Sequence, residues 1–269
     1  MDKAVIMARG LGKRMRQQDP DAGLSPEQAE MAATGVKALI PIDRPFLDYV
    51  LSALADAGYR RVCLVVGPEH EELRRYYGEM IRYQRLELEF AIQVRPLGTA
   101  DAVAAAESFA AGEPFLVINS DNYYPIAALA SLRNLQGPGL AAFSREGMLA
   151  GSNIPPERLS RFALVEIDDQ GCLRRIVEKP DPALLASLPE PVWVSMNCWR
   201  FDQGIFAACR AVKPSPRGEL ELTDAVQYAA EVLGQRFQVL RCAEAVLDLS
   251  SRADVGPVAA RLAGREVSV

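Results

Sequence analysis

Short continuous runs of apolar residues, each ended by a glycine or a polar residue, restrict the fold of this chain more than any other feature. The clearest run covers residues 62–66, and Phe115–Asn119 is a second. A strand that is apolar along its whole length is buried on both faces, as in a parallel sheet covered by helices on both sides. Between these runs, residues 46–57 carry apolar side chains at helical spacing. This alternation predicts an α/β fold built on a largely parallel sheet.

The second half of the chain follows a different pattern. Apolar and polar residues alternate over 162–168 and again around 173–179, with a turn at Gln170 and Gly171 between them. Such alternation is typical of a β-hairpin, so we expect antiparallel strands there. No linker-like stretch divides the chain. We therefore predict one α/β domain over residues 1–269, with a mixed sheet and a β-rich second half.

Local signals place several helices. Ser25, Pro26 and Gln28 form the start signature of a short helix that Gly35 would end. The alanine-rich stretch 100–110 predicts one further helix. The only histidine, His70, lies among acidic residues, and we expect it at the surface.

Charge and cysteine usage exclude several classes of function. The net charge of -5 argues against a nucleic acid or an anionic membrane as the main partner. The five cysteines are scattered without a C-x-x-C pair, which disfavours a zinc or dithiol site and indicates reduced thiols. The first apolar run has only about five residues, too few for a signal peptide or a membrane span. We expect a cytoplasmic protein.

The N-terminal strand leads into a glycine-rich turn. Residues 4–8 are followed by Gly10 and Gly12 and then by the cations Lys13 and Arg14. A turn of this kind can present backbone N–H groups to an anion. It is neither a dinucleotide fingerprint, since Met15 occupies the place of the third glycine, nor a Walker loop. The alternative is an ordinary tight turn with two solvated cations.

Further polar residues follow the other predicted strands. In open α/β sheets, ligands bind at the carboxyl ends of the strands. The residues found there are Gly98, Thr99, Asp121, Asn122, Glu178, Lys179 and Asp248. Each has a structural alternative: a turn at Asp121, a helix cap at Thr99 or Asp248, a solvated cation at Lys179. Taken together, carboxylates, cations and glycine loops at one sheet edge indicate a divalent metal and a polyphosphate.

These motifs resemble, in order and over nearly the whole chain, those of the sugar nucleotidyltransferase (sugar-1-phosphate NTP transferase) family. The corresponding segments are Ala4 to Met15 for A-x-I-L-A-A-G-x-G-T-R-M, Lys37 to Pro41 for P-K-x-L-x-P-V, Gln93 to Ala100 for Q…L-G-T-A, Asp121, Val177 to Pro180 for V-E-K-P, Leu222 to Ala225 for L-T-D-A, and Val246 to Ser251 for W-x-D-I-G-T.

The resemblance implies a Rossmann-like, GT-A-like fold, with a nucleotide-binding half at about 1–145 and a sugar-phosphate-binding half at about 146–269. It also implies that a sugar-1-phosphate oxygen attacks the α-phosphate of an NTP and expels pyrophosphate. A phosphate monoester is already largely ionised at neutral pH, so no strong general base is needed. Positioning and charge neutralisation supply most of the catalysis in such reactions.

The roles implied by the resemblance are as follows. Arg14, Lys37 and Lys179 would be catalytic, acting on the β/γ-phosphates, the α-phosphate and the sugar phosphate respectively. The nucleotide would be bound by Ala8, Gly10, Leu11, Gly12, Lys13, Gln93, Gly98 and Thr99. Mg²⁺ would be held by Asp121 and Asp248. The sugar would contact Asn122, Glu178, Ser195 and Asn197.

The chain also departs from the family pattern. Arg9 replaces a small residue, Lys13 replaces threonine, and the segment 17–36 is longer than the usual link to Lys37, so that a lid is conceivable. Asn197 stands at a glycine position. Gln93 favours a pyrimidine base, hence UTP or dTTP, because its amide can both donate and accept.

Three alternatives stay open at this stage. The enzyme could be a guanylyltransferase acting on a mannose- or heptose-type 1-phosphate, or could transfer the nucleotide to a non-sugar phosphate. The third alternative is a catalytically silent nucleotide-binding protein. A homo-oligomer is possible in each case.

Overall fold

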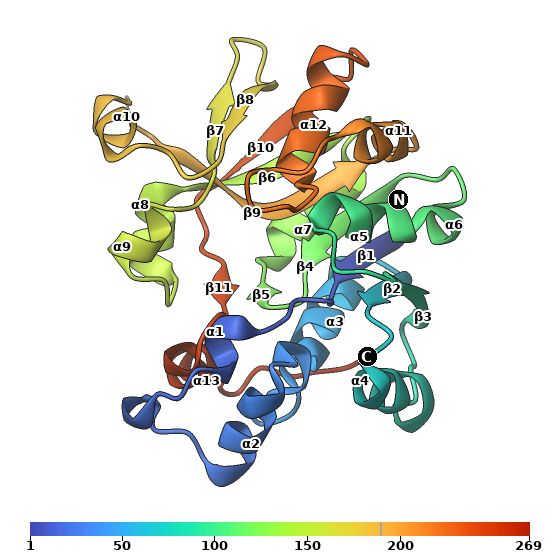
Figure 1. The fold of residues 1–269 in the computed structure, drawn as a ribbon, viewed down its shortest axis with the longest axis vertical. Helices are drawn as coiled ribbons and strands as arrows, with labels where there is room; N and C mark the ends of the chain where they lie inside the picture. Colours follow the sequence, from blue (N-terminus) through green and yellow to red (C-terminus); the bar gives the residue numbers. More distant parts are fainter. Residues whose placement is uncertain (189) are drawn as a thin grey trace.

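The computed structural model describes residues 1–188 and 190–269, and a nine-stranded mixed sheet forms its centre (Figure 1). The strands are β1 (Lys3–Met7), β2 (Arg61–Val66), β3 (Glu87–Ile92), β4 (Phe115–Asn119), β6 (Gly139–Ser144), β7 (Leu164–Ile167), β8 (Leu173–Val177), β9 (Trp193–Phe201) and β10 (Gln238–Cys242), with β5 (Asn122–Tyr123) and β11 (Leu247–Asp248) paired separately.

The helices connect and cover these strands. They are α1 (Lys13–Arg16), α2 (Pro26–Thr34), α3 (Phe46–Asp56), α4 (Glu71–Arg75), α5 (Thr99–Ala105), α6 (Glu107–Ala110), α7 (Ile126–Asn134), α8 (Arg145–Gly151), α9 (Pro156–Leu159), α10 (Pro182–Ser187), α11 (Gly204–Ala211), α12 (Leu222–Glu231) and α13 (Val255–Leu262). Short 3₁₀ turns occur at Pro20–Ala22, Lys37–Leu39 and Arg252–Asp254, and a π turn at Tyr76–Met80. None of the helices in the described ranges is long and apolar enough to cross a membrane.

The main path of the sheet runs β10-β6-β9-β4-β1-β2-β3. β1 pairs in parallel with β2 and β4, β2 with β3, and β6 with β10, whereas β9 runs antiparallel between β4 and β6. Parallel pairs therefore predominate along this path. The predicted α/β fold with a mixed, mostly parallel sheet is confirmed.

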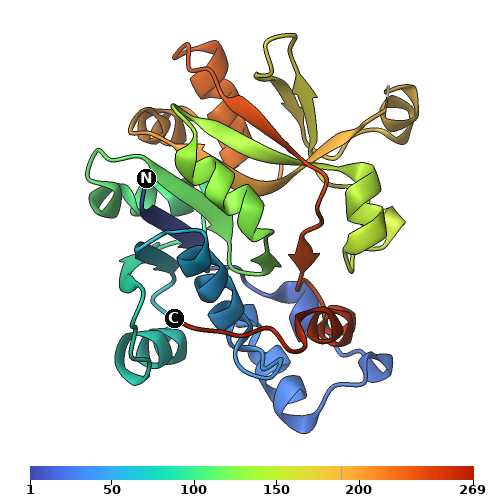
Figure 2. The ribbon, with the colours of Figure 1, turned by 180° about the vertical axis from the view of Figure 1, so that it is seen from behind.

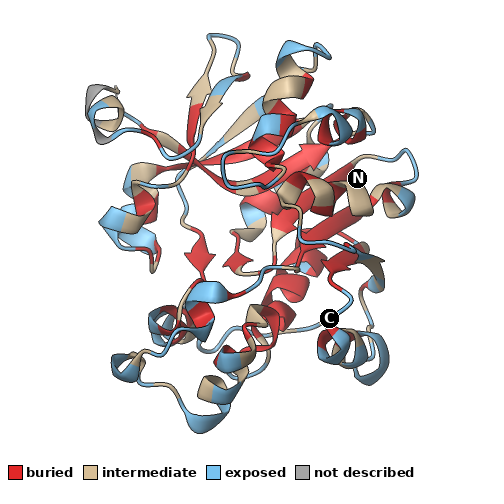
Figure 3. Cartoon of the chain, viewed as in Figure 1, coloured by how far each residue is buried: buried red, intermediate tan, exposed pale blue. Residues whose placement is uncertain are grey.

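Helices cover both faces of the sheet, as the fully apolar strands predicted. Alternate residues of β1 enter two separate cores: Ala4 and Ile6 pack with α3 and α7, and Val5 packs with α5, α11 and α12. Figure 2 shows α3 and α7 crossing one face, and Figure 3 shows the central strands as the most buried part of the molecule. Burial on both sides explains why β1, β2 and β4 contain no charged residue between their ends.

The second half of the chain is joined to the first through the sheet itself. β9 lies between β4 and β6, and the predicted hairpin is present as β7 and β8, which pair antiparallel. The hairpin joins β9 where Leu164 pairs with Val194, and it projects from the sheet at the upper edge of Figure 1. Strands from both halves thus meet along one path.

Two local expectations need correction. The stretch 100–110 is not one helix, because α5 and α6 are separated at Ala106. His70 is buried and not at the surface. Its Nδ1 accepts a hydrogen bond from the Gly67 N–H at 3.1 Å, which fastens the turn after β2.

The segment 17–36 is packed against the N-terminal loop. As predicted, Ser25 and Gln28 form a capping box at the start of α2, and Gly35 ends the helix in the left-handed region. A Cβ at Gly12 would lie 2.2 Å from the Gly35 carbonyl oxygen, so the two glycines permit a close backbone contact. The buried Arg252 donates to the carbonyls of Met15 and Ala29. The end of α2 therefore packs against the glycine loop and supports it.

Candidate active site

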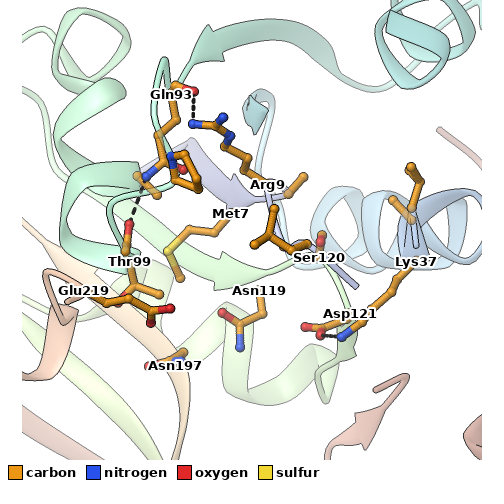
Figure 4. A pocket seen from close by; sticks show the side chains of 18 residues that line it. Met7, Arg9, Lys37, Gln93, Thr99, Asn119, Ser120, Asp121, Asn197 and Glu219 are labelled. Atoms are coloured by element: carbon orange, nitrogen blue, oxygen red, sulfur yellow. Dashed lines mark hydrogen bonds and ion pairs between the residues drawn. The ribbon is translucent and has the colours of Figure 1, made fainter. Parts of the chain in front are cut away.

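A cavity of about 320 Å³ opens at the carboxyl ends of β1, β3 and β4 (Figure 4). β1 is flanked there by β2 on one side and β4 on the other, which is where α/β sheets bind ligands. Its wall is formed by Met7, Ala8, Arg9, Gly10, Leu11, Val36, Lys37, Ala38, Gln93, Pro96, Gly98, Thr99, Ala102, Asn119, Ser120, Asp121, Asn197 and Glu219. Two charged groups mark its ends: Arg9 beside Gln93, and Lys37 beside Asp121.

The glycine loop forms one side of this cavity. A Cβ added to Gly10 would have no atom within 4 Å, so open space lies beside the loop there. Ala8 and Leu11 line the cavity as well, as the sequence predicted. Gly12, Lys13 and Arg14 lie outside the cavity wall in the described structure. Gly12 instead adopts a left-handed conformation at the start of α1.

Arg14 points toward the second carboxylate of the site. Its Nη2 lies 3.3 Å from Ser250 Oγ, and the Ser250 hydroxyl donates to Asp248 Oδ1 at 2.9 Å. Lys13 is exposed. Arg14 is therefore next to the carboxylate end of the site and not at the Gln93 end.

Lys37 and Asp121 form an ion pair of 2.7 Å between Nζ and Oδ2. Their side chains are 15% and 23% exposed, which leaves both within reach of a ligand in the cavity. Lys37 comes from the 3₁₀ turn after α2, and Asp121 lies two residues after the last residue of β4. The structure thus brings together two predicted residues that are 84 positions apart in the chain.

Asp248 is buried beside this pair. β11 pairs with β5 so that Asp248 is opposite Asn122, and the Leu249 N–H donates to the Asp121 carbonyl at 2.8 Å. Asp248 Oδ1 accepts hydrogen bonds from Asn122 and Ser250, whereas Oδ2 lies 3.3 Å from the Arg158 guanidinium without hydrogen-bond geometry. Burial and then the charge of Asp121 raise the pKa of Asp248 to about 6, against the lowering effects of Ser250 and Arg158.

These donors suit a divalent cation bound together with a polyphosphate. Asp248 Oδ2 is a buried carboxylate oxygen without a hydrogen bond, and Asp121 is near enough for its charge to raise the pKa of Asp248. No cluster of three or more metal-ligating side chains occurs in the described part of the chain. Mg²⁺ commonly uses one or two carboxylates and takes its other ligands from phosphate and water. The pair fits that pattern.

Asn122 holds the Asp248 carboxylate in place through a hydrogen bond. Its Nδ2 donates to Asp248 Oδ1 at 3.0 Å and to the Leu247 carbonyl at 3.4 Å, and its Oδ1 accepts from Asn119. Asn122 is buried, and these bonds use both of its donor hydrogens. The structure therefore places this candidate sugar ligand as a positioning residue for the carboxylate.

Gln93 and Gly98 lie at the opposite end of the cavity. The Gln93 amide nitrogen donates to the Gly98 carbonyl at 2.9 Å and to Asp101 at 2.8 Å. A Cβ at Gly98 would lie 2.5 Å from the Leu220 carbonyl oxygen, so only glycine fits this turn. Thr99 Oγ1 accepts from the Leu222 N–H at 2.8 Å and so ties α5 to α12. Thr99 is the first residue of α5 and not its N-cap, which is Gly98.

Glu178 and Lys179, which were predicted to bind the sugar and its phosphate, lie at the end of the hairpin and outside the cavity wall. Glu178 and Lys179 follow β8, both are exposed, and Lys179 has φ of 45°, an unfavourable value for a residue with a side chain. Glu178 is exposed as a residue, but its carboxyl group is surrounded by protein atoms, and this burial raises the pKa of the carboxyl. The negative charge of Glu221 raises this pKa further. Near Glu178 the buried Thr223 hydroxyl lacks a geometrically sound hydrogen bond.

Asn197 lines the cavity, and its backbone explains its departure from the family glycine. Its φ is 54°, in the left-handed region where asparagine is the best-tolerated residue after glycine. Its Oδ1 accepts from the Trp199 indole at 3.3 Å. Ser195 is buried outside the cavity wall.

The sequence reading missed Glu219 in the cavity wall and Arg158 on Asp248. Glu219 lies three residues before Leu222, the first residue of the L-T-D-A motif, and this proximity was the signal that could have identified it. Arg158 lies on α9, in a stretch without a recognisable pattern, and no local signal pointed to it. It also pairs with Asp254 at 2.8 Å, so it links α9 to the turn that carries Ser251.

The chain is similar to several known proteins in sequence and in fold. A family model for nucleotidyl transferases matches residues 3–248. The low-salt glycan biosynthesis nucleotidyltransferase Agl11 of Haloferax volcanii is 27% identical over 235 residues, covering 85% of this chain and 57% of that protein. A glucose-1-phosphate thymidylyltransferase of Streptomyces antibioticus is 30% identical over 84% of this chain and 56% of the relative. The chain thus spans little more than half the length of these relatives.

Solved structures share the fold at low sequence identity. A UDP-glucose pyrophosphorylase complexed with UDP-glucose superimposes with a TM-score of 0.73 at 18% identity, over 97% of this chain and 98% of the other. A UTP-bound UGPase from Acinetobacter baumannii gives a TM-score of 0.72 at 17% identity, over 99% and 95%. Because the family model spans the segment from the first strand to Asp248, the chain belongs to the nucleotidyl transferase family, as its resemblance to sugar nucleotidyltransferases predicted.

Proposed function

We propose that this protein transfers a nucleoside monophosphate from an NTP, most favourably UTP or dTTP, to a sugar-1-phosphate in a Mg²⁺-dependent reaction. The observation that carries the proposal is the meeting of Lys37 and Asp121 at one end of a cavity whose other end is built from Gln93 and Gly98. Asp248 is buried beside this pair, outside the cavity wall. A nucleotide placed with its base at Gln93 has its phosphates at the charged end.

The reaction then needs little acid–base chemistry. An oxygen of the sugar-1-phosphate attacks the α-phosphorus, a new P–O bond forms, and the bond to the β-phosphate oxygen breaks with release of pyrophosphate. The attacking phosphate is already ionised near neutral pH. This agrees with the cavity wall, which contains no histidine.

Each residue has a physical task in this scheme. The glycine loop leaves room for the phosphates, and Lys37 neutralises charge on the α-phosphate once it exchanges Asp121 for the nucleotide. Arg14, beside Ser250 and Asp248, attracts the leaving pyrophosphate. Asp121 and Asp248 would hold Mg²⁺, which supplies charge neutralisation and orientation of the phosphates when bound. Glu178 and Lys179 would bind the sugar hydroxyls and the sugar phosphate.

The relatives support the same reaction class. They include proteins named glucose-1-phosphate thymidylyltransferase, UTP--glucose-1-phosphate uridylyltransferase and mannose-1-phosphate guanylyltransferase. These names cover more than one base and more than one sugar, so they support the reaction more strongly than the substrate.

A pyrophosphate-release assay tests the proposal. The protein is offered UTP, dTTP, GTP, CTP or ATP with glucose-1-phosphate, mannose-1-phosphate or phosphocholine, with Mg²⁺ or with a chelator. We expect Mg²⁺-dependent release with a sugar-1-phosphate. Release with phosphocholine alone would move the activity to non-sugar phosphates. Absence of release with every pair, from a folded protein that still binds an NTP, would indicate a silent nucleotide-binding protein.

A further inference from the structure

Arg9 stands in the cavity wall with its side chain only 7% exposed. It replaces a small residue of the family pattern and extends from the loop after β1 toward Gln93, at the end of the cavity away from Lys37 (Figure 4). Buried arginine is uncommon unless it is paired. Its contacts therefore indicate what it does.

The guanidinium is fixed on two sides. Nε lies 3.1 Å from Glu69 Oε1 and Nη2 lies 3.3 Å from Glu69 Oε2, and Nη1 donates to the Gln93 carbonyl. The Glu69 carboxylate balances the positive charge. Arg9 lies at the end of the cavity away from Lys37 and Asp121, where the phosphates are proposed to bind, so its position argues that Arg9 does not serve the phosphates.

Arg9 still has unused donors. A guanidinium carries five N–H groups and no acceptor, and the three contacts above engage three of them. The two remaining hydrogens, one on each Nη, are free for a ligand. Because the group never loses its charge, it offers only donors at any physiological pH.

The neighbouring Gln93 offers only an acceptor. Both hydrogens of its amide nitrogen are taken, by the Gly98 carbonyl and by Asp101. Within the described ranges no donor reaches its Oε1. Gln93 therefore offers a ligand only an acceptor, and the expectation that its amide both donates to and accepts from a pyrimidine base was wrong.

A donor beside an acceptor matches one type of base edge. Uracil, thymine and guanine each present a carbonyl next to a ring N–H. Cytosine and adenine present an amino group next to a bare ring nitrogen, which would place donor against donor and acceptor against acceptor. Polar sites that leave a buried group unpaired reject the wrong ligand strongly.

We propose that Arg9 is a specificity-determining residue that selects nucleotides with a carbonyl beside a ring N–H and rejects cytosine and adenine nucleotides. The inference rests on the proposed nucleotidyl transfer and names its nucleotide class. Glu69 and Asp101 act as positioning residues, since each fixes the hydrogen bonding of a residue that faces the base.

Binding of UTP and CTP tests this inference, because the two differ only at the base edge in question. Calorimetry with Mg²⁺ and each nucleotide, without sugar phosphate, gives the ratio of their Kd values. We expect the unaltered protein to bind UTP at least about tenfold more tightly than CTP. Arg9→Gln keeps much of the side-chain volume but can also accept, so we expect the preference to fall about tenfold or more.

Two further variants complete the design. Arg74→Ala removes a guanidinium that donates to the carbonyls of Gly67 and Pro68 in the same turn without lining the cavity, and we expect an unchanged ratio. Glu69→Gln keeps Arg9 but loosens it, and we expect a smaller loss of preference. It also keeps the inference testable if Arg9→Gln does not fold, as judged by thermal unfolding.

The possible failures separate the two proposals. An unaltered UTP-to-CTP ratio in folded Arg9→Gln, or in Glu69→Gln if only that variant folds, overturns the role of Arg9 while leaving nucleotidyl transfer intact. Pyrophosphate release that proceeds best with CTP or ATP also overturns it. If no NTP binds to the unaltered protein, both proposals fail.

Discussion

The two ends of the candidate site differ in whether their charged side chains form ion pairs within the protein. At the end proposed to bind the nucleotide, here called the nucleotide end, Arg9 is paired with Glu69 and Lys37 with Asp121, and Arg9, Lys37 and Asp121 line a cavity with formed walls. At the end proposed to bind the sugar phosphate, here called the sugar end, Glu178 and Lys179 are exposed beyond a hairpin, and no ion pair of Lys179 occurs among the described residues. The nucleotide end is preorganised, whereas the sugar end depends on its ligand for partners.

This difference has a physical cause. The nucleotide end is built from β1, β3 and β4, which are held in the sheet, and α2 supports the loop through the Gly12–Gly35 contact. The hairpin of β7 and β8 pairs with the sheet at two points, where Leu164 meets Val194 and where Cys172, just before β8, bridges Gln238 of β10, and β8 also contacts α12. Groups on such a projecting element are less fixed than groups at the ends of buried strands.

The largest effect is expected for the carboxylate that closes the nucleotide end. Asp248→Asn removes the charge at Oδ2 but keeps the shape, and we expect pyrophosphate release to fall by about 10³-fold, because electrostatic groups at the reacting phosphates dominate such catalysis. Initial rates over a Mg²⁺ titration measure this. Near-normal turnover at every Mg²⁺ concentration would remove Asp248 from the proposed metal site.

Lys179→Ala tests whether the sugar end acts separately. We expect KM for the sugar-1-phosphate to rise about 10- to 100-fold, because a charge-assisted contact to phosphate is lost, while KM for the NTP changes little. Steady-state kinetics with each substrate varied in turn give both values. Equal increases in the two KM values would mean that Lys179 serves the nucleotide, and the contrast between the ends would disappear.

The same Asp248→Asn variant should stabilise the metal-free protein. The folded-state pKa of Asp248 is about 6, above its ordinary value of 3.8, so the folded protein binds this proton more tightly than the unfolded chain. Its contribution to stability is therefore lost as the pH rises through about 4 to 6. At about pH 7.5 we expect asparagine to stabilise the fold by about 1–3 kcal/mol, with a smaller gain near pH 4.

Chemical denaturation of both proteins at the two pH values, with a chelator present, checks this expectation. A variant less stable than the unaltered protein at about pH 7.5 would show that the hydrogen bonds from Asn122 and Ser250 outweigh the cost of the buried charge. The ionised Asp248 with its hydrogen bonds would then stabilise the folded protein even without a bound ligand.

The smallest effect concerns the support beneath the nucleotide end. Ser25→Ala removes one side of the capping box of α2, and we expect a loss of about 1 kcal/mol in the free energy of unfolding. If α2 only supports the loop, KM for both substrates stays unchanged. A large change in turnover without a change in stability would instead indicate that the segment 17–36 moves during catalysis.

Much of this arrangement could be predicted from the chain alone. The apolar runs show where β1, β2 and β4 lie, and parallel strands bring their carboxyl ends to one edge, so the glycine loop, Gly98 and Asp121 are placed by pattern and topology together. The capping box of α2 is likewise a local signal. The hairpin was recognisable because it alternates.

Other parts had no local signal. The prediction that His70 lies at the surface was wrong, because its side chain is buried and accepts a hydrogen bond from the Gly67 N–H. No residue near it in the sequence indicates this hydrogen bond. The helix predicted over 100–110 breaks at Ala106 although the stretch is rich in alanine. The sequence alone does not explain why Asn197 stands at a glycine position, and its positive φ provides the explanation.

The sequence by itself determined the kind of sheet, the position of its polar edge and the family, because those follow from burial of continuous apolar runs and from motifs a few residues long. Only the tertiary structure decided which distant charges meet there. Asp248 reaches Asp121 because β11 pairs with β5, Arg158 reaches Asp248 from α9, and Glu69 fixes Arg9 across 60 positions. Such pairings depend on where the chain returns in space, and residue patterns within one segment do not carry that information.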